Sequence, residues 1–151
     1  MALVYDNWHV NLLVVVATAL TVALVVLVHY EGLIWLSGRL AGHWNNPRRK
    51  VLYAIYVLLA LHVTEIWVFG VVIRLLLGIE GSGQVVGMQG HNLLDAVYLS
   101  AVTFTTVGFG DMVPVGALRF LTGTEALTGL VLVTWSASFT YIEMEKFWRA
   151  R

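Results

Sequence analysis

The chain is 151 residues long, has a formal net charge of zero, and is 59% hydrophobic with a mean hydropathy of +0.81. This composition lies far above ordinary globular usage and predicts an integral, multi-pass membrane protein, while no basic stretch is dense enough to bind nucleic acid. The absence of cysteine excludes disulfides, thiolate metal sites and cysteine nucleophiles.

Three apolar runs are long enough to cross a bilayer as helices, which takes about 20 residues. They cover residues 10–36, 51–78 and 115–141. A shorter apolar run at 93–104 cannot cross and predicts a re-entrant helix. Non-helical backbone at membrane depth is tolerated only where protein buries it or where it lines a water-filled path, so the loop after residue 104 predicts a pore. We therefore expect an all-α membrane protein with three transmembrane helices and one re-entrant helix.

The basic residues gather on one side of the predicted spans. Those between the first two spans and after the third are Arg39, Arg48, Arg49, Lys50, Lys146, Arg149 and Arg151. The positive-inside tendency makes that side cytoplasmic, with the N-terminus outside and the C-terminus inside, in the cell inner (plasma) membrane. A cleaved secretory signal is the weaker alternative, because the first ten residues contain no Lys or Arg.

Ionisable side chains inside predicted spans are costly and usually face protein or water. They are His29, Glu31, His62, Glu65, Arg74 and Glu125. His62 and Glu65 are three residues apart and share a helical face. Glu65 and Glu125 lie at comparable depth, so we expect them to approach each other or the hydroxyls of Thr18 and Thr21. Two roles stay open for His62, Glu65 and Glu125: polar packing that locks helices together, and proton sensing.

The re-entrant helix has a recognisable start and is followed by an unusual loop. Asn92 can cap the helix, and Asp95 suits the positive end of its dipole. The loop reads Thr105-Thr106-Val107-Gly108-Phe109-Gly110-Asp111. Such a run supplies main-chain carbonyls and a threonine hydroxyl, the oxygens that can replace the water shell of K⁺ without fixed charge. The two glycines permit the backbone angles that aligned carbonyls need.

This loop resembles the filter signature T-V-G-Y/F-G-D of the potassium channel family, and the looser match extends over residues 92–140. The resemblance implies that K⁺ binds the carbonyls of the filter and the innermost hydroxyl, with no other cofactor. The ion-binding residues would be Thr106, Val107, Gly108, Phe109 and Gly110. Those supporting the filter would be Thr105, Asp111, Val102 and Tyr98.

The sequence departs from the family pattern around the filter. Phe109 lacks the tyrosine hydroxyl that is common there. Tyr98 and Leu99 stand where many members have tryptophan, and Val102 stands where some have glutamate. We therefore expect the bonds that brace the filter to differ from those of such members.

The resemblance also implies the organisation of the chain. An N-terminal part, 1–50, would hold the extra first helix and a cytoplasmic loop, and a pore domain would fill 51–151. The pore domain would comprise an outer helix 51–78, a pore helix 92–104, the filter 105–111 and an inner helix 115–141. One chain supplies one filter strand, whereas the ion needs oxygens all around it, so we expect a homotetramer embedded in membrane lipid.

One face of the inner helix would line a cavity or form a gate. Residues three or four apart on that face are Leu130, Val133, Ala137 and Tyr141. Gly129 lies where related channels often place a flexible glycine, so a hinge and a packing role both stay open.

The leading hypothesis is a pore-forming subunit of a potassium-selective channel that conducts K⁺ passively and is not an enzyme. The alternatives are a weakly selective monovalent cation channel, a non-conducting accessory subunit, and a membrane-embedded metal-dependent hydrolase. The hydrolase would use His29, Glu31, His62, Glu65 and Glu125.

Overall fold

The computed structural model describes residues 7–42, 47–88, 90 and 92–148. Most of these residues are helical. In chain order the elements are α1 (Trp8–Leu40), α2 (Pro47–Leu76), β1 (Gln84–Val86), α3 (Leu93–Phe104), β2 (Val113–Val115) and α4 (Leu118–Trp148).

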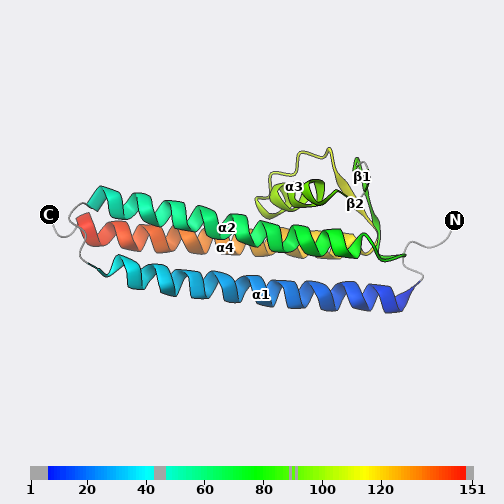
Figure 1. The fold of residues 1–151 in the computed structure, drawn as a ribbon, viewed down its shortest axis with the longest axis horizontal. Helices are drawn as coiled ribbons and strands as arrows, with labels where there is room; N and C mark the ends of the chain where they lie inside the picture. Colours follow the sequence, from blue (N-terminus) through cyan, green and yellow to red (C-terminus); the bar gives the residue numbers. More distant parts are fainter. Residues whose placement is uncertain (1–6, 43–46, 89, 91, 149–151) are drawn as a thin grey trace.

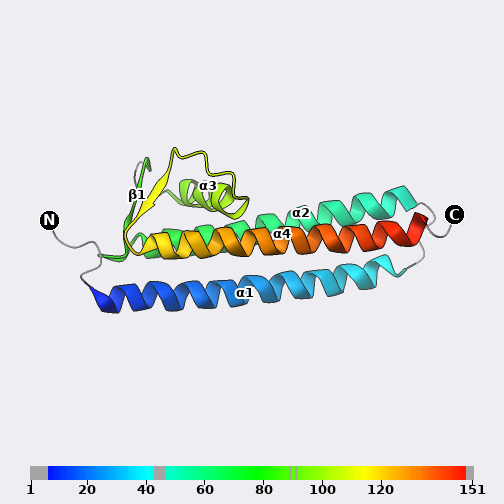
Figure 2. The same cartoon turned by 180° about the vertical axis from the view of Figure 1, so that it is seen from behind.

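Three long helices run side by side along the longest axis of the molecule (Figures 1 and 2). The short helix α3 packs on α2 and α4, on the side away from α1 and near the end where α1 begins. The opposite end carries basic residues, and there Lys50 Nζ lies 3.4 Å from a carboxylate oxygen of Glu143, joining the start of α2 to the end of α4. Arg149 and Arg151 lie outside the described residues.

The mostly helical fold predicted from the composition is confirmed. Within the described residues, α1 and α2 are long and apolar enough to cross a membrane, by length and composition only. They contain or overlap the predicted spans 10–36 and 51–78. The third predicted span corresponds to α4, which is richer in serine and threonine and falls short of that standard.

The short apolar helix lies where the sequence places it. Its range is Leu93–Phe104, and the backbone N–H of Leu94 donates to Asn92 Oδ1 at 3.1 Å, which confirms the predicted cap. Asp95 stands in the first turn. A carboxylate at this end of a helix is stabilised by the helix dipole.

Two glycines let α3 approach its neighbours closely. A Cβ atom on Gly70 of α2 would lie 2.8 Å from the Cα atom of Val97 in α3. A Cβ atom on Gly129 of α4 would lie 2.1 Å from the carbonyl oxygen of Phe104, at the end of α3. Both distances are too short for any side chain, so Gly129 serves packing in this structure. The hinge weighed for it from the sequence has no support in these contacts.

A small antiparallel sheet, which was not expected from the sequence, pairs β1 with β2. Gln84 lies opposite Val115, and Val86 lies opposite Val113. The pairing joins the two ends of the segment that contains α3 and the loop after it. Gly87 permits this contact, because a Cβ atom there would lie 2.0 Å from the carbonyl oxygen of Asp111.

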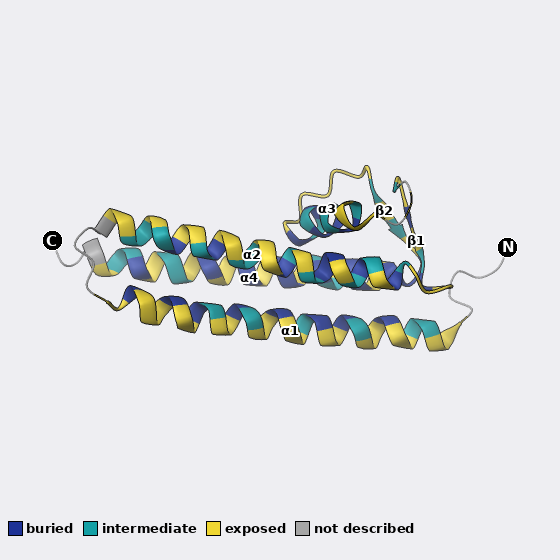
Figure 3. Ribbon diagram, viewed as in Figure 1, coloured by how far each residue is buried: buried dark blue, intermediate teal, exposed yellow. Residues whose placement is uncertain are grey.

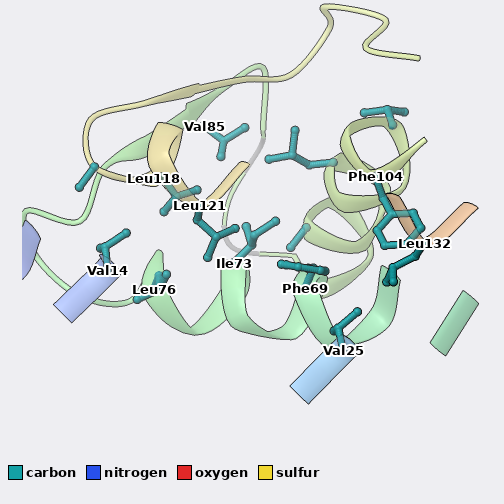
Figure 4. Packing of buried hydrophobic residues seen from close by; sticks show 14 residues of the cluster. Val14, Val25, Phe69, Ile73, Leu76, Val85, Phe104, Leu118, Leu121 and Leu132 are labelled. Atoms are coloured by element: carbon teal, nitrogen blue, oxygen red, sulfur yellow. The ribbon is translucent and has the colours of Figure 1, made fainter. Parts of the chain in front are cut away.

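The core consists of two clusters. The larger one gathers buried side chains from α1, α2, α3 and α4 beneath the short helix, including Val25, Phe69, Phe104 and Leu132 (Figure 4). The smaller one joins the C-terminal half of α1 to the N-terminal half of α2, around Leu36. Buried residues line the inner side of the long helices, whereas the outer side of α1 is largely exposed (Figure 3).

The Gly129 contact predicts a clear effect of one methyl group. Gly129→Ala should lower the stability of the purified protein by about 1–3 kcal/mol, because the added Cβ must displace the end of α3. Thermal unfolding in detergent measures the change. Gly38→Ala is the matched control, since no atom of another described residue, beyond its chain neighbours and its own helix backbone, lies within 4 Å of a Cβ atom at that helical glycine. If the two variants unfold at the same temperature, the close approach of α3 to α4 is not a packing constraint.

Candidate functional site

The loop after α3 has a repeating backbone conformation. The φ angle is positive at Thr106 (60°), Gly108 (52°) and Gly110 (80°), which are every second residue. Thr106 is the one non-glycine residue with positive φ in the described part of the chain. Such a conformation costs about 1–3 kcal/mol at a residue with a side chain and is found mainly at functional sites. An alternating strand of this kind allows successive carbonyl oxygens to face the same side.

The N–H groups of this loop turn back toward α3. The N–H of Gly108 donates to the carbonyl oxygen of Val102 at 3.0 Å, and the N–H of Thr106 donates to that of Thr103 at 2.9 Å. The Thr105 hydroxyl donates to the carbonyl oxygen of Ala101 at 2.7 Å.

The carbonyl oxygens of residues 106–109 are free of such bonds. None of them accepts a hydrogen bond from another described residue. The loop therefore offers four consecutive unbonded oxygens, at the positions that the sequence singles out for ion binding.

A side-chain bond closes the far end of the loop. The Tyr98 hydroxyl of α3 donates to Asp111 Oδ2 at 2.8 Å. The hydrogen bond to Asp111 raises the pKa of the Tyr98 phenol above its ordinary value, so the phenol keeps its proton and remains a donor. The bracing bond at this point is thus a tyrosine–aspartate pair. The sequence already suggested an unusual brace here, because Tyr98 stands where many potassium channels have tryptophan.

The loop is exposed in the single chain. The side chains of Val107 and Phe109 are 55% and 70% exposed, although both are apolar. An open hollow lies beside the loop, lined by Thr106, Gly108 and Gly110 together with Thr122 and Gly123 of α4.

The predicted cavity residues lie on the exposed part of α4. Leu130, Val133, Ala137 and Tyr141 are all exposed in the single chain, whereas Gly129 is buried beneath Phe104.

A second polar group joins α1 to α2. The carboxylate of Glu65 lies between two imidazoles, with Oε1 2.7 Å from His29 Nδ1 and Oε2 2.8 Å from His62 Nδ1. Glu65 and His29 are fully buried, and the Trp135 ring of α4 lies 5.3 Å from the His29 ring.

The prediction that His62 and Glu65 share a helical face is confirmed by their bond, whereas the contacts expected of Glu65 with Glu125 or with the hydroxyls of Thr18 and Thr21 are wrong. Its partners are histidines, and the hydroxyls of Thr18 and Thr21 donate to carbonyl oxygens of their own helix, each at 2.7 Å. Glu125 bonds to Ser100 of α3 instead. One signal could have found His29. It belongs to a stripe of residues three or four apart that α1 buries, together with Val25 and Leu33.

The histidine–glutamate group has the types of side chain that bind metal ions. Its three ligand atoms lie within 4.8 Å of one another, a set that Zn²⁺ accepts in principle. Each Nδ1 atom, however, already bonds to the carboxylate, and His29 Nε2 is buried without a partner among the described residues. A histidine that binds a metal usually has its other nitrogen fixed by an acceptor. The group is therefore explained better as a hydrogen-bonded carboxylate.

The five residues considered for a hydrolase do not form one site. Glu31 is exposed on α1, and Glu125 bonds to α3 rather than to the histidines. The remaining three are the group just described.

Comparison with known proteins places the loop inside a recognised region. A family model described as "Ion channel" matches residues 61–146, which is more than half of the chain and includes α3, the loop and nearly all of α4. Protein LctB of Bacillus caldotenax is 29% identical over 110 residues, covering 64% of this chain and 80% of that protein. Protein LctB of Geobacillus stearothermophilus is 45% identical over 40 residues, covering 26% of this chain and 30% of that protein. No solved structure matches.

The contacts of Glu65 predict its importance for stability. Glu65→Ala should destabilise the protein by about 2–5 kcal/mol, because two imidazole N–H groups between α1 and α2 lose their acceptor. Thermal unfolding in detergent measures the loss, and Glu31→Ala, at an exposed glutamate of α1, is the control. Equal unfolding temperatures for the two variants would contradict the role given to this group.

Proposed function

The chain belongs to the ion channel family, and we propose that this protein is the pore-forming subunit of a potassium-selective channel that conducts K⁺ passively. Like the family as a whole, it transports ions rather than catalysing a reaction.

The four unbonded carbonyl oxygens of residues 106–109 carry the proposal. Rings of such oxygens can replace the hydration shell of K⁺ without adding fixed charge. The alternation of positive φ at Thr106, Gly108 and Gly110 supports a common direction for these oxygens. K⁺ would bind the carbonyls of Thr106, Val107, Gly108 and Phe109, and the Thr106 hydroxyl would supply the innermost ring.

A single strand cannot surround an ion, so the proposal includes a homotetramer. The exposed apolar side chains of Val107 and Phe109 and the open hollow beside them fit a face that other copies of the chain cover. Rotation about one axis would place four identical strands around it and close the ring.

The proposal includes three membrane crossings, with α4 as the third. Its threonine hydroxyls donate to carbonyls of their own helix, as Thr128 does to Thr124 and Thr134 does to Leu130, which lowers the cost of placing them in an apolar medium. A helix that faces a water-filled cavity also needs fewer apolar residues than one surrounded by lipid. The exposed residues Leu130, Val133, Ala137 and Tyr141 would line that cavity.

The proposed orientation places the basic end of the bundle in the cytoplasm. The filter then opens to the outside, and the C-terminal end of α3, which carries partial negative charge, faces the cavity where a hydrated cation would wait.

Flux through liposomes tests the function directly. The purified protein should take up K⁺ down its gradient without any other polypeptide, and should pass Na⁺ far more slowly. Gly108→Ala should reduce K⁺ flux about tenfold or more, because it strains the filter backbone. Gly90→Ala is the matched control, since that glycine also has positive φ, has no other described residue within 4 Å of a Cβ atom, and lies outside the loop.

Each other outcome favours a different function. Equal K⁺ and Na⁺ flux would indicate a weakly selective cation channel. Absence of flux, with a folded and reconstituted protein, would indicate an accessory subunit.

A further inference from the structure

Glu125, in the first half of α4, is an unusual buried acid. Its side chain is 0% exposed, its Oε1 atom lies 2.5 Å from the hydroxyl oxygen of Ser100 in α3, and its Oε2 atom is buried with no partner among the described residues. The Ser100 hydroxyl is thus the only hydrogen-bonding neighbour of Glu125 in the part of the chain that the structure describes.

Within the described part of the chain, no positive charge balances a carboxylate at this place. Among the described residues, no basic side chain forms an ion pair with Glu125. The histidines of α1 and α2 are bonded to Glu65, Lys50 and Lys146 contact Glu143, and Asp95 of α3 is itself acidic. Arg74 and Arg119 likewise make no ion pair with it. A buried ionised carboxylate without a partner costs so much that such a group normally takes up a proton.

The hydrogen atoms around Ser100 point to the same conclusion. Ser100 Oγ lies 2.8 Å from the carbonyl oxygen of Ile66 in α2 and 2.5 Å from Glu125 Oε1. The hydroxyl has one proton, and the carbonyl can only accept. If Glu125 were ionised, one of these two close oxygen pairs would contain no proton and would be repulsive. If the carboxyl group carries its own proton, it donates to Ser100, and Ser100 donates to Ile66.

We propose that Glu125 is a neutral carboxylic acid at about pH 7, and that in this form it is a positioning residue that ties α3 to α2 and α4 through Ser100. The protonation state follows from local geometry alone. The positioning role rests on the proposed function, because α3 carries the filter. Ser100 lies two residues before Val102, whose carbonyl holds the N–H of Gly108. A shift of α3 at Ser100 would therefore reach the filter directly.

Infrared spectroscopy tests the protonation state. The difference spectrum between the natural protein and Glu125→Gln, both folded at about pH 7, should contain the C=O stretching band of a protonated carboxylic acid. Ser100→Ala keeps Glu125 but removes the hydroxyl that accepts its hydrogen bond, so the band should move to higher frequency. This variant tests the protonation state if Glu125→Gln does not fold. Glu80→Gln, at an exposed glutamate, should contribute carboxylate bands instead. Carboxylate bands from Glu125 would overturn the proposal.

K⁺ flux in liposomes tests the positioning role. Glu125→Gln should keep flux near that of the natural protein, because the neutral amide can still donate to Ser100. Glu125→Leu has a similar volume but no donor, and should lose about fivefold or more. Equal flux in these two variants would overturn the positioning role. If the natural protein itself carries no flux, the proposed function fails, while the infrared result still decides the state of Glu125.

Discussion

The geometry of the loop after α3 depends on how closely α3 approaches α2 and α4. Gly70 and Gly129 remove the side chains that would keep the short helix away, and Ser100 then reaches a carbonyl of one long helix and a carboxyl of the other. Once α3 is held on both sides, its last turn fixes the start of the loop through bonds from Thr105, Thr106 and Gly108. The carbonyl oxygens of residues 106–109 accept no hydrogen bond from another described residue.

The first helix is attached by a separate set of contacts. The buried stripe of α1 packs along α2 and α4, and the His29–Glu65 bond fixes its position along the bundle. Since α1 lies on the opposite side of α2 and α4 from α3, it leaves the loop uncovered. The exposed apolar side of α1 suits contact with lipid (Figure 3).

Local features of the sequence were enough to predict α3, because its cap, its first-turn acid and its apolar run lie within a few consecutive residues. The unusual loop was equally visible, since its glycines and threonines are adjacent. The sheet was not predicted, because its strands are three residues long and their pairing depends on where α3 places them. His62 was predicted to share a helical face with Glu65, but the partners on other helices, His29 of Glu65 and Ser100 of Glu125, could not be predicted. They depend on the register between helices, which the periodicity of one helix does not contain.

The pairing of β1 with β2 brings together the two ends of the segment between them, so the closure of this segment does not depend on the long helices alone. Because residues 84–86 and 113–115 already hold its two ends together, the entropic cost of closing this loop is met by contacts within the unit itself. The stretch from β1 to β2 is thus a segment that can be exchanged as one unit. A chimaera that exchanged it between related chains would carry its own closure with it, and would need from its host the two glycines against which the short helix packs and the two groups that bond to Ser100.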